Sequence, residues 1–158
     1  MSEEKCFFVL RIRGEVGMRE ELEDVFKFLH ITRKNHATII KGTPSNLGMI
    51  QKIKDYATWG EASLETISIV LRGRGLVIGN KKLTDDYVKE NLEYDSIDGL
   101  AKAIYELKVN FWKLDNVKPV LRLHPPRGGF RRQVRRSFPG GELGYRGEAM
   151  NQLLKKMI

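Results

Sequence analysis

Cysteine is scarce in this 158-residue sequence, and long apolar runs and the pattern of a secretory signal at its start are lacking. Its single cysteine, Cys6, excludes an internal disulfide and a cysteine-ligated metal cluster. No apolar run approaches the roughly 18 residues that a membrane span needs, and the start, Met-Ser-Glu-Glu-Lys, does not resemble a secretory signal. We therefore expect a chain of the reducing cytosol, without a membrane partner, in which Cys6 is a small buried apolar residue.

Patterns of catalytic or metal-binding residues are equally scarce. The histidines His30, His36 and His124 are far apart and lack metal-ligand spacing, and no local Ser-His-Asp or Cys-His signature occurs. The stretch Arg72-Gly-Arg-Gly75 lacks the spacing of a phosphate-binding Walker loop, so we interpret it as a turn. The sequence thus predicts no enzyme, no cofactor, no metal and no small-molecule substrate.

Acidic residues are nearly absent from the last quarter of the chain, and the positive charge is concentrated there. The net charge is +8, but residues 1–117 hold 18 basic and 18 acidic residues. Residues 118–158 hold ten basic residues against Glu142 and Glu148. A concentrated excess of this kind creates a local positive potential that attracts a polyanion.

The segment 122–136 has the highest density of arginine, with six in fifteen residues and no acid. Arginine matches phosphate geometry with a planar fork, and glycine allows a close approach of the backbone to a partner. For Phe130 two roles remain open, stacking on an unpaired base or anchoring the loop on the core. The candidates for RNA contact in this segment are Arg127, Gly128, Gly129, Phe130, Arg131, Arg132, Arg135 and Arg136.

A second candidate cluster follows the first predicted helix. Arg33 and Lys34 can contact phosphates, and Asn35 and His36 can hydrogen-bond to sugar or base. An ordinary polar connection is the alternative for this turn. One short strand further on lie two more candidates, the cation of Lys41 and the amide groups at the helix start, Thr43.

Apolar spacing predicts an α+β fold with a ferredoxin-like β-α-β-α-β core, a small antiparallel sheet backed by two helices. Phe8, Leu10 and Ile12 alternate onto one strand face, and Thr43-Pro44 is a typical helix start. The predicted core elements are a strand at 6–13, a helix at 18–29, a strand at 37–41, a helix from 43 to about 55 and a strand at 56–59.

We expect two parts, a core at 1–60 and a mostly helical extension at 61–158 that packs against it. Ser63, Thr84 and Ser96 are predicted to start short helices. The rest of the extension is predicted as a return strand at 119–123, a loop at 124–141 within a basic region of about 122–141, and a closing helix at 146–157.

The residues 28–56 resemble the core of the ribosomal protein L thirty family of the large subunit. The family's turn, Thr-Pro pair and Gly-Met-Ile motif appear as Thr32-Arg33-Lys34-Asn35, Thr43-Pro44 and Gly48-Met49-Ile50. The C-terminal runs 122–130 and 144–148 resemble its longer archaeal form, the counterpart of the eukaryotic protein L seven. The sequence departs from the family at His30, where glycine is usual, and at Leu47, where arginine is common; we expect Leu47 to pack in the core.

The resemblance implies a structural protein of the large ribosomal subunit in the cytoplasm. Its expected partners are 23S ribosomal RNA, near the region where 5S ribosomal RNA docks, and neighbouring large-subunit proteins. Two alternatives remain from the residues alone. One is a module that uses the basic segment to bind an acidic protein, and the other is a small enzyme acting on a nucleotide or phosphate.

Overall fold

The computed structural model describes residues 5–14, 17–77, 79, 81–92, 94–114, 117–130, 133–138 and 140–158, with residues 113 and 133–135 described by their backbone alone. No helix in this described part is long and apolar enough to cross a membrane. The elements in chain order are β1 (Cys6–Arg11), α1 (Glu20–Phe28), β2 (His36–Lys41), α2 (Pro44–Lys52), β3 (Ala57–Glu61), α3 (Leu64–Arg74), β4 (Leu76–Val77), β5 (Lys81–Lys82), α4 (Asp85–Asn91), α5 (Ile97–Tyr105), the 3-10 helix η1 (Phe111–Lys113), β6 (Leu121–Arg122), β7 (Gln133–Ser137), β8 (Gly141–Tyr145) and α6 (Ala149–Met157).

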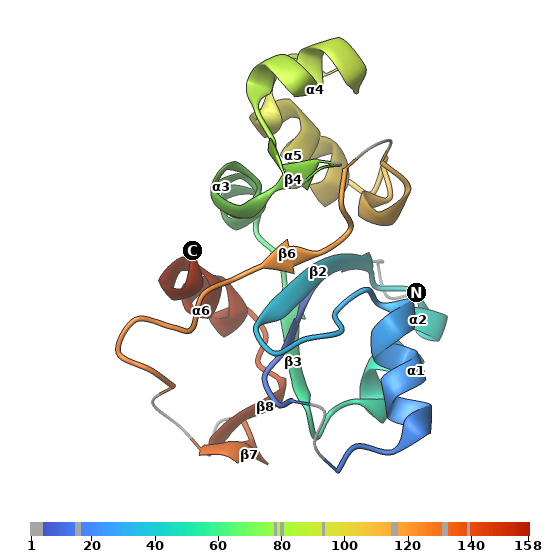
Figure 1. The fold of residues 1–158 in the computed structure, drawn as a ribbon, viewed down its shortest axis with the longest axis vertical. Coiled ribbons are helices and arrows are strands. Elements are labelled where there is room, and N and C mark those ends of the chain that lie inside the picture. The colour runs from blue at the N-terminus through green and yellow to red at the C-terminus, as the bar shows by residue number, and fades with distance from the viewer. Residues whose placement is uncertain are drawn as a thin grey trace.

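The main sheet has six strands in the order β6-β2-β1-β3-β8-β7 (Figure 1). The central strand β1 pairs antiparallel with β2 and β3, and β6 pairs antiparallel with β2. β8 lies parallel to β3, so the sheet mixes both directions. The first three strands and the helices α1 and α2 reproduce the predicted β-α-β-α-β unit, and β4 and β5 form a separate small ribbon.

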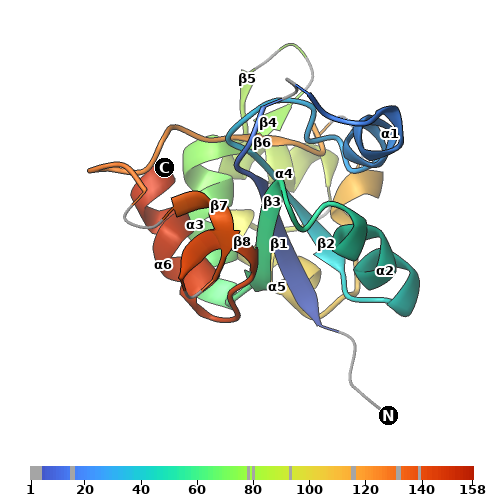
Figure 2. The ribbon, with the colours of Figure 1, turned by 90° about the horizontal axis from the view of Figure 1, so that it is seen from below.

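Both faces of the sheet are covered, and β1 is buried along its whole length. Phe8 and Leu10 face a cluster that contains apolar residues of α3, α5 and α6. Phe7 and Val9 face the opposite cluster, which contains residues of α1 and α2. Figure 2 shows the strands between α1 and α2 on one side and α3 and α6 on the other. The predicted face of β1 is therefore confirmed, and full burial of each large side chain contributes about 1.5–3 kcal/mol.

Hydroxyl side chains start four of the helices, as the sequence predicts. In each case the hydroxyl oxygen accepts a hydrogen bond from the amide three residues further on, which satisfies a donor that the helix leaves free. The capping residues are Thr43, Ser63, Thr84 and Ser96. Leu47, one turn into α2, packs against the cluster beneath that helix, as expected.

The prediction of a loop at 124–141 is wrong in part. This segment contains β7 and the first residue of β8, and β8 is buried except for Tyr145. The closing helix begins at Ala149, whereas Arg146 is buried ahead of it. The sequence gives no local signal for β8, because the segment is rich in glycine and arginine. The burial of β8 depends on its pairing with the distant strand β3, in which Gly144 lies opposite Thr58.

Candidate nucleic-acid interface

The turn between α1 and β2 presents two of the predicted cations to solvent. Arg33 and Lys34 are exposed at its tip. The turn is tied to the central strand because the Asn35 amide donates a hydrogen bond to the Arg11 carbonyl at 2.9 Å. Asn35 has a positive φ of 67°, a backbone state that asparagine tolerates better than most residues. The cations therefore stand on a defined turn between two packed elements.

Strand β6 lies directly beside this turn, which joins two basic segments that are far apart in the sequence. In the β2–β6 pairing His36 lies opposite Arg122, whose side chain is exposed. The Leu123 amide also donates a hydrogen bond to the Asn35 carbonyl at 3.2 Å. Arg122 thus extends the positive surface of Arg33 and Lys34 along the edge of the sheet.

The pKa of half-buried His36 reflects its burial and the positive charges at this edge. Burial, followed by the nearby charges of Arg122, Arg33 and Arg11, lowers the pKa of His36 below its ordinary value of 6.5. The imidazole is therefore predominantly neutral at pH 7. Its Nδ1 atom and Oδ1 of Asn35 are buried, and neither has a hydrogen-bond partner within the described residues.

A buried arginine beneath the turn was missed by the sequence analysis. Arg11 is 1% exposed, and its guanidinium donates a hydrogen bond to the Ile31 carbonyl at 3.3 Å. The guanidinium also lies 4.2 Å from the ring centre of Phe26. Its position in the apolar run of β1 is the only signal of this burial in the sequence. Arg11 adds a fixed positive charge behind the exposed cations.

The segment after β6 continues along the last turn of α6. The His124 amide donates to the Met157 carbonyl at 2.9 Å, and the Arg127 amide donates to the Lys156 carbonyl at 3.1 Å. The side chains of Arg127 and Lys156 are both exposed. We call the exposed set of Arg33, Lys34, Arg122, Arg127 and Lys156 the basic edge.

Phe130 is held by the protein itself. Its side chain is partly buried and packs against the larger apolar cluster. It lines a cavity of about 110 Å³ together with Pro126, Phe138 and Arg146. Of the two roles left open for this ring, the anchoring role accounts for its contacts. Gly128 and Gly129 form the exposed turn before it, with φ values of 76° and 75° that favour glycine.

The remaining candidates lie away from the basic edge. Arg136 is exposed on β7, at the opposite margin of the sheet from β6. The side chain of Arg135 and the whole of Arg131 and Arg132 lie outside the described residues. Arg122 on β6 and Arg136 on β7 thus lie at opposite margins of the sheet.

Lys41 and Thr43 lie at the far end of β2 from His36. Lys41 is exposed. The Thr43 hydroxyl accepts a hydrogen bond from the Asn46 amide at 3.2 Å, so this donor at the helix start is already used. The structure does not bring these two residues together with the turn at Arg33.

Fold and surface together define an α+β protein that carries exposed cations along one edge of a mixed sheet. No group of three or more His, Cys, Asp or Glu side chains in the described ranges is arranged to hold a metal ion. A family model described as "Ribosomal protein L30p/L7e" matches residues 7–57, which include all of β1 except Cys6, together with α1, β2 and α2.

Full-length relatives extend this similarity over the rest of the chain. The protein of Methanosphaera stadtmanae is 46% identical over 152 residues, covering 96% of this chain and 99% of its own length. Those of Methanopyrus kandleri and Archaeoglobus fulgidus are 45% and 44% identical, covering 93% and 96% of this chain and 100% and 99% of their own lengths. All three are named "Large ribosomal subunit protein uL30". The chain therefore belongs to this family of cytoplasmic large-subunit proteins, which are structural and not enzymes.

Proposed function

We propose that this chain binds 23S ribosomal RNA in the large subunit, near the docking region of 5S ribosomal RNA, mainly through the basic edge. The observation that carries the proposal is the pairing of His36 with Arg122, which places two cationic segments side by side. The finer placement near 5S RNA rests on the family resemblance. Neighbouring large-subunit proteins are the expected further partners.

Three cations of the basic edge are available to phosphates. Within the part of the chain that the structure describes, Arg33, Lys34 and Arg127 form no ion pair. By contrast, Arg72 is an exposed arginine that contacts two carboxylates, those of Asp85 and Asp98. Unpaired guanidinium groups can therefore give their forked donors to phosphate oxygens.

Asn35 and His36 are proposed to make polar contacts with an RNA sugar or base at the place where the cations of the basic edge bind the RNA phosphates. Their free acceptor atoms need a small rearrangement of the turn, because both atoms are buried. Separate outlying contacts are proposed for Lys41, the helix start at Thr43, and Arg135 and Arg136 of β7. Arg131 and Arg132, which lie outside the described residues, are proposed as RNA contacts from the sequence, and the turn at Gly128 and Gly129 as a close approach. Phe130 then acts as the anchor of this segment.

Salt dependence tests the proposal because phosphate binding releases counterions. With about six phosphates neutralised, the affinity falls roughly a thousandfold or more between about 50 and 200 mM salt. The RNA of choice is 23S RNA of Archaeoglobus fulgidus, whose protein is 44% identical. Filter binding is measured for the unchanged chain and for the triple variant Arg33→Ala, Arg122→Ala, Arg127→Ala.

The triple variant is expected to lower the salt slope by about 3 and the affinity by about 10- to 100-fold at 100 mM salt. The matched control is Lys52→Ala, Lys89→Ala, Lys102→Ala, which removes three exposed charges from α2, α4 and α5. Equal losses in the two triple variants would contradict a specific basic edge. Hydroxyl-radical footprints on 23S RNA, with and without 5S RNA, test the finer placement.

A further inference from the structure

Three aromatic rings meet on the surface where α1 ends. Phe28 is 57% exposed and His30 is also exposed. The ring centre of Trp112, in η1, lies 5.8 Å from that of Phe28 and 5.7 Å from that of His30. The corresponding interplanar angles are 88° and 75°, so both rings stand edge-on to the indole. We call these three side chains the aromatic cluster.

The indole of Trp112 is fixed by the sheet beneath it. Its Nε1–H donates a hydrogen bond to the Thr38 hydroxyl oxygen at 2.7 Å. Thr38 is fully buried in β2, and its own hydroxyl donates to the Pro119 carbonyl at 2.8 Å. A chain of two hydrogen bonds therefore sets the orientation of the ring before any partner arrives.

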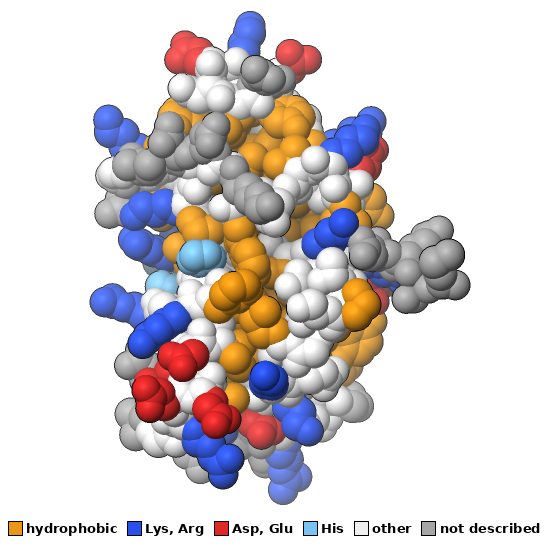
Figure 3. Space-filling model, turned by 90° about the vertical axis from the view of Figure 1, so that its right-hand side faces the viewer, with side chains coloured by type: hydrophobic (Ala, Val, Ile, Leu, Met, Phe, Trp, Pro, Cys, Tyr) orange, Lys and Arg blue, Asp and Glu red, His pale blue; other side chains and the backbone are white. Residues whose placement is uncertain are grey.

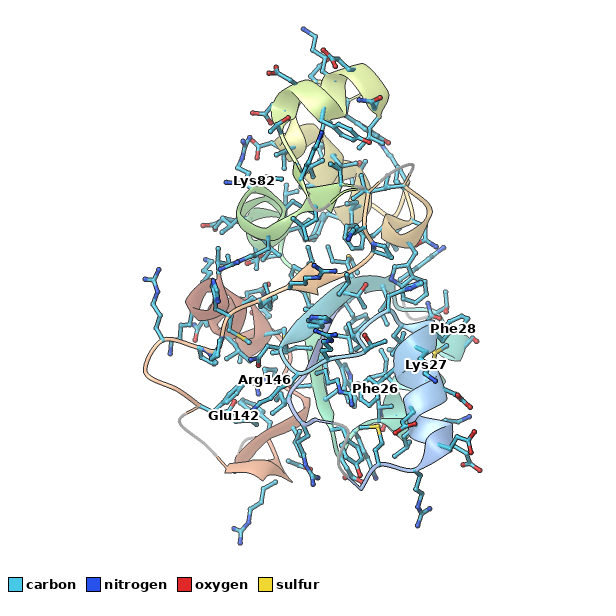
Figure 4. The ribbon with its side chains drawn as sticks, viewed as in Figure 1. Phe26, Lys27, Phe28, Lys82, Glu142 and Arg146 are labelled. Atoms are coloured by element: carbon cyan, nitrogen blue, oxygen red, sulfur yellow. The ribbon has the colours of Figure 1, made fainter. Side chains whose placement is uncertain are left out.

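The position of Phe28 is not explained by the packing of α1. Two residues earlier, Phe26 is 1% exposed and faces the sheet, whereas Phe28 points away from it (Figure 4). The positive φ of His30, 64°, belongs to the end of α1, where the His30 and Ile31 amides donate to the Lys27 and Phe26 carbonyls. This helix end holds His30 beside Trp112, and the exposed aromatic surface marks a candidate interaction site.

The charged residues around the aromatic cluster indicate the kind of partner that it binds. Lys27 precedes Phe28, and Arg33 and Lys34 follow His30 within four residues; all three cations are exposed. Three of the four acidic residues of α1 lie in its first turn, at the other end of the helix, and exposed Asp24 lies one turn before Phe28. In Figure 3 hydrophobic side chains run down the middle of this face, Lys and Arg line its left margin and also lie at its right and lower edges, and one group of Asp and Glu lies at lower left. Aromatic rings flanked by cations suit single-stranded RNA, because bases stack while phosphates pair.

We propose that Phe28, His30 and Trp112 form a stacking surface for an unpaired RNA base, with Lys27, Arg33 and Lys34 holding the adjoining phosphates. This inference rests on the proposed function and adds to it a second kind of contact, to a base instead of the backbone. None of the three rings belongs to the RNA-binding residues predicted from the sequence.

Tryptophan fluorescence tests this stacking directly. The chain has two tryptophans, and Trp59 is 4% exposed, so quenching by a bound base reports on Trp112. The probes are a nine-nucleotide oligoadenylate and a ribose-phosphate chain of equal length without bases. We expect quenching by the first probe alone, and an affinity about 5- to 100-fold higher for it.

The variants Phe28→Ala and Trp112→Ala are expected to remove that preference, and Phe28→Ala, which keeps Trp112, is expected to weaken the quenching, while 23S RNA binding keeps its salt slope. The control Tyr105→Ala removes an aromatic side chain that is 46% exposed on α5 and should change neither. Circular dichroism confirms that each variant is folded. Rescue of the preference by Phe28→Tyr would support stacking over a merely structural role.

The outcomes separate this inference from the proposed function. Salt-dependent binding of 23S RNA, with equal binding of both nine-unit probes and no quenching, would overturn the stacking surface alone. The stacking surface would also be overturned if Phe28→Ala bound oligoadenylate and 23S RNA normally but no longer associated with large subunits. That result would assign the aromatic cluster to contact with a neighbouring protein. If the unchanged chain bound neither 23S RNA nor oligoadenylate, both proposals would be overturned.

Discussion

Glu142 and Arg146 form a buried ion pair that ties β8 to the rest of the sheet. Their side chains are 4% and 3% exposed, and Nη2 of Arg146 lies 2.7 Å from Oε2 of Glu142. Arg146 also donates a hydrogen bond to the hydroxyl of Thr58 on β3 at 2.8 Å. Figure 4 shows the two charged side chains directed toward each other. A pair with this many partners leaves an uncompensated charge when one member is removed.

Glu142→Ala is expected to lower the free energy of unfolding by about 3–5 kcal/mol, measured by urea denaturation, because it strands the Arg146 guanidinium in the interior. The control is Asp98→Ala, which breaks the exposed pair with Arg72 and should change stability by less than about 1 kcal/mol. Similar losses in both variants would argue against a special role for burial.

His36 should make stability depend on pH. Its pKa is lowered in the folded chain by burial and by Arg122, Arg33 and Arg11. The unfolded chain therefore binds a proton more readily, so this stability is fully present above about pH 6.5 and is lost as the pH falls through the folded pKa. We expect His36→Gln to reduce the loss of unfolding free energy between about pH 7 and 5.

RNA binding should raise the pKa of His36 partway toward its ordinary value, because it offsets the part of the shift that nearby arginines cause. Phosphates placed beside Arg33 and Arg122 offset the positive potential that disfavours the imidazolium. Titration of the imidazole by NMR is expected to give a higher pKa for His36 in the RNA complex than in the free chain. An unchanged pKa would place the phosphates away from this edge.

At the scale of elements, Gly60 permits the contact between β3 and α6. A Cβ at this position would meet the Gly147 carbonyl oxygen and would lie 2.7 Å from Cβ of Met150. Gly48, in α2, has nothing near the corresponding position. Close packing between β3 and α6 therefore requires a glycine at position 60, whereas no neighbouring atom requires one at position 48.

Gly60→Ala is expected to destabilise the chain by about 1–3 kcal/mol, because the helix must move off the strand. Gly48→Ala is expected to stabilise it by about 0.5–1 kcal/mol through the higher helix propensity of alanine. Thermal unfolding of both variants checks that Gly60→Ala lowers the stability and Gly48→Ala raises it. A destabilised Gly48→Ala together with a tolerated Gly60→Ala would contradict the packing described here.

Local signals predicted most elements, but not those whose stability comes from distant partners. Thr43, Ser63, Thr84 and Ser96 mark helix starts because a cap acts within three residues. Strand β8 was missed because it pairs with β3, more than 80 residues away in the sequence, and β7 was missed because it pairs in turn with β8. The 3-10 helix that carries Trp112 gave no periodic pattern either, since it spans three residues.

At the scale of the whole molecule, the larger apolar cluster joins the first 60 residues to the last 98. It includes Phe8 and Leu10 of β1 together with Leu100, Met150 and Leu154. The division at residue 60 stays a prediction of sequence, whereas the sheet and this cluster run across it. Much of the β1 surface would meet water if the later residues were removed.

We expect a fragment of residues 1–61 to lack cooperative unfolding, because one face of its sheet and the outer edge of β3 would be uncovered. The full chain should unfold in a single transition. Chemical denaturation followed by circular dichroism and by tryptophan fluorescence checks both. A fragment with a sharp transition of its own would support an independent core at 1–60.

The sequence by itself determined the helix caps, the apolar face of β1 with Phe8 and Leu10, the excess of arginine after residue 118 and the motifs of a ribosomal protein family. Each of these depends on neighbouring residues or on composition. Only the tertiary structure decided that Arg33 lies near Arg122, that Phe28 and His30 meet Trp112, and that Arg136 lies on the opposite margin. These contacts arise from strand order and register across long stretches of chain, which no local spacing encodes.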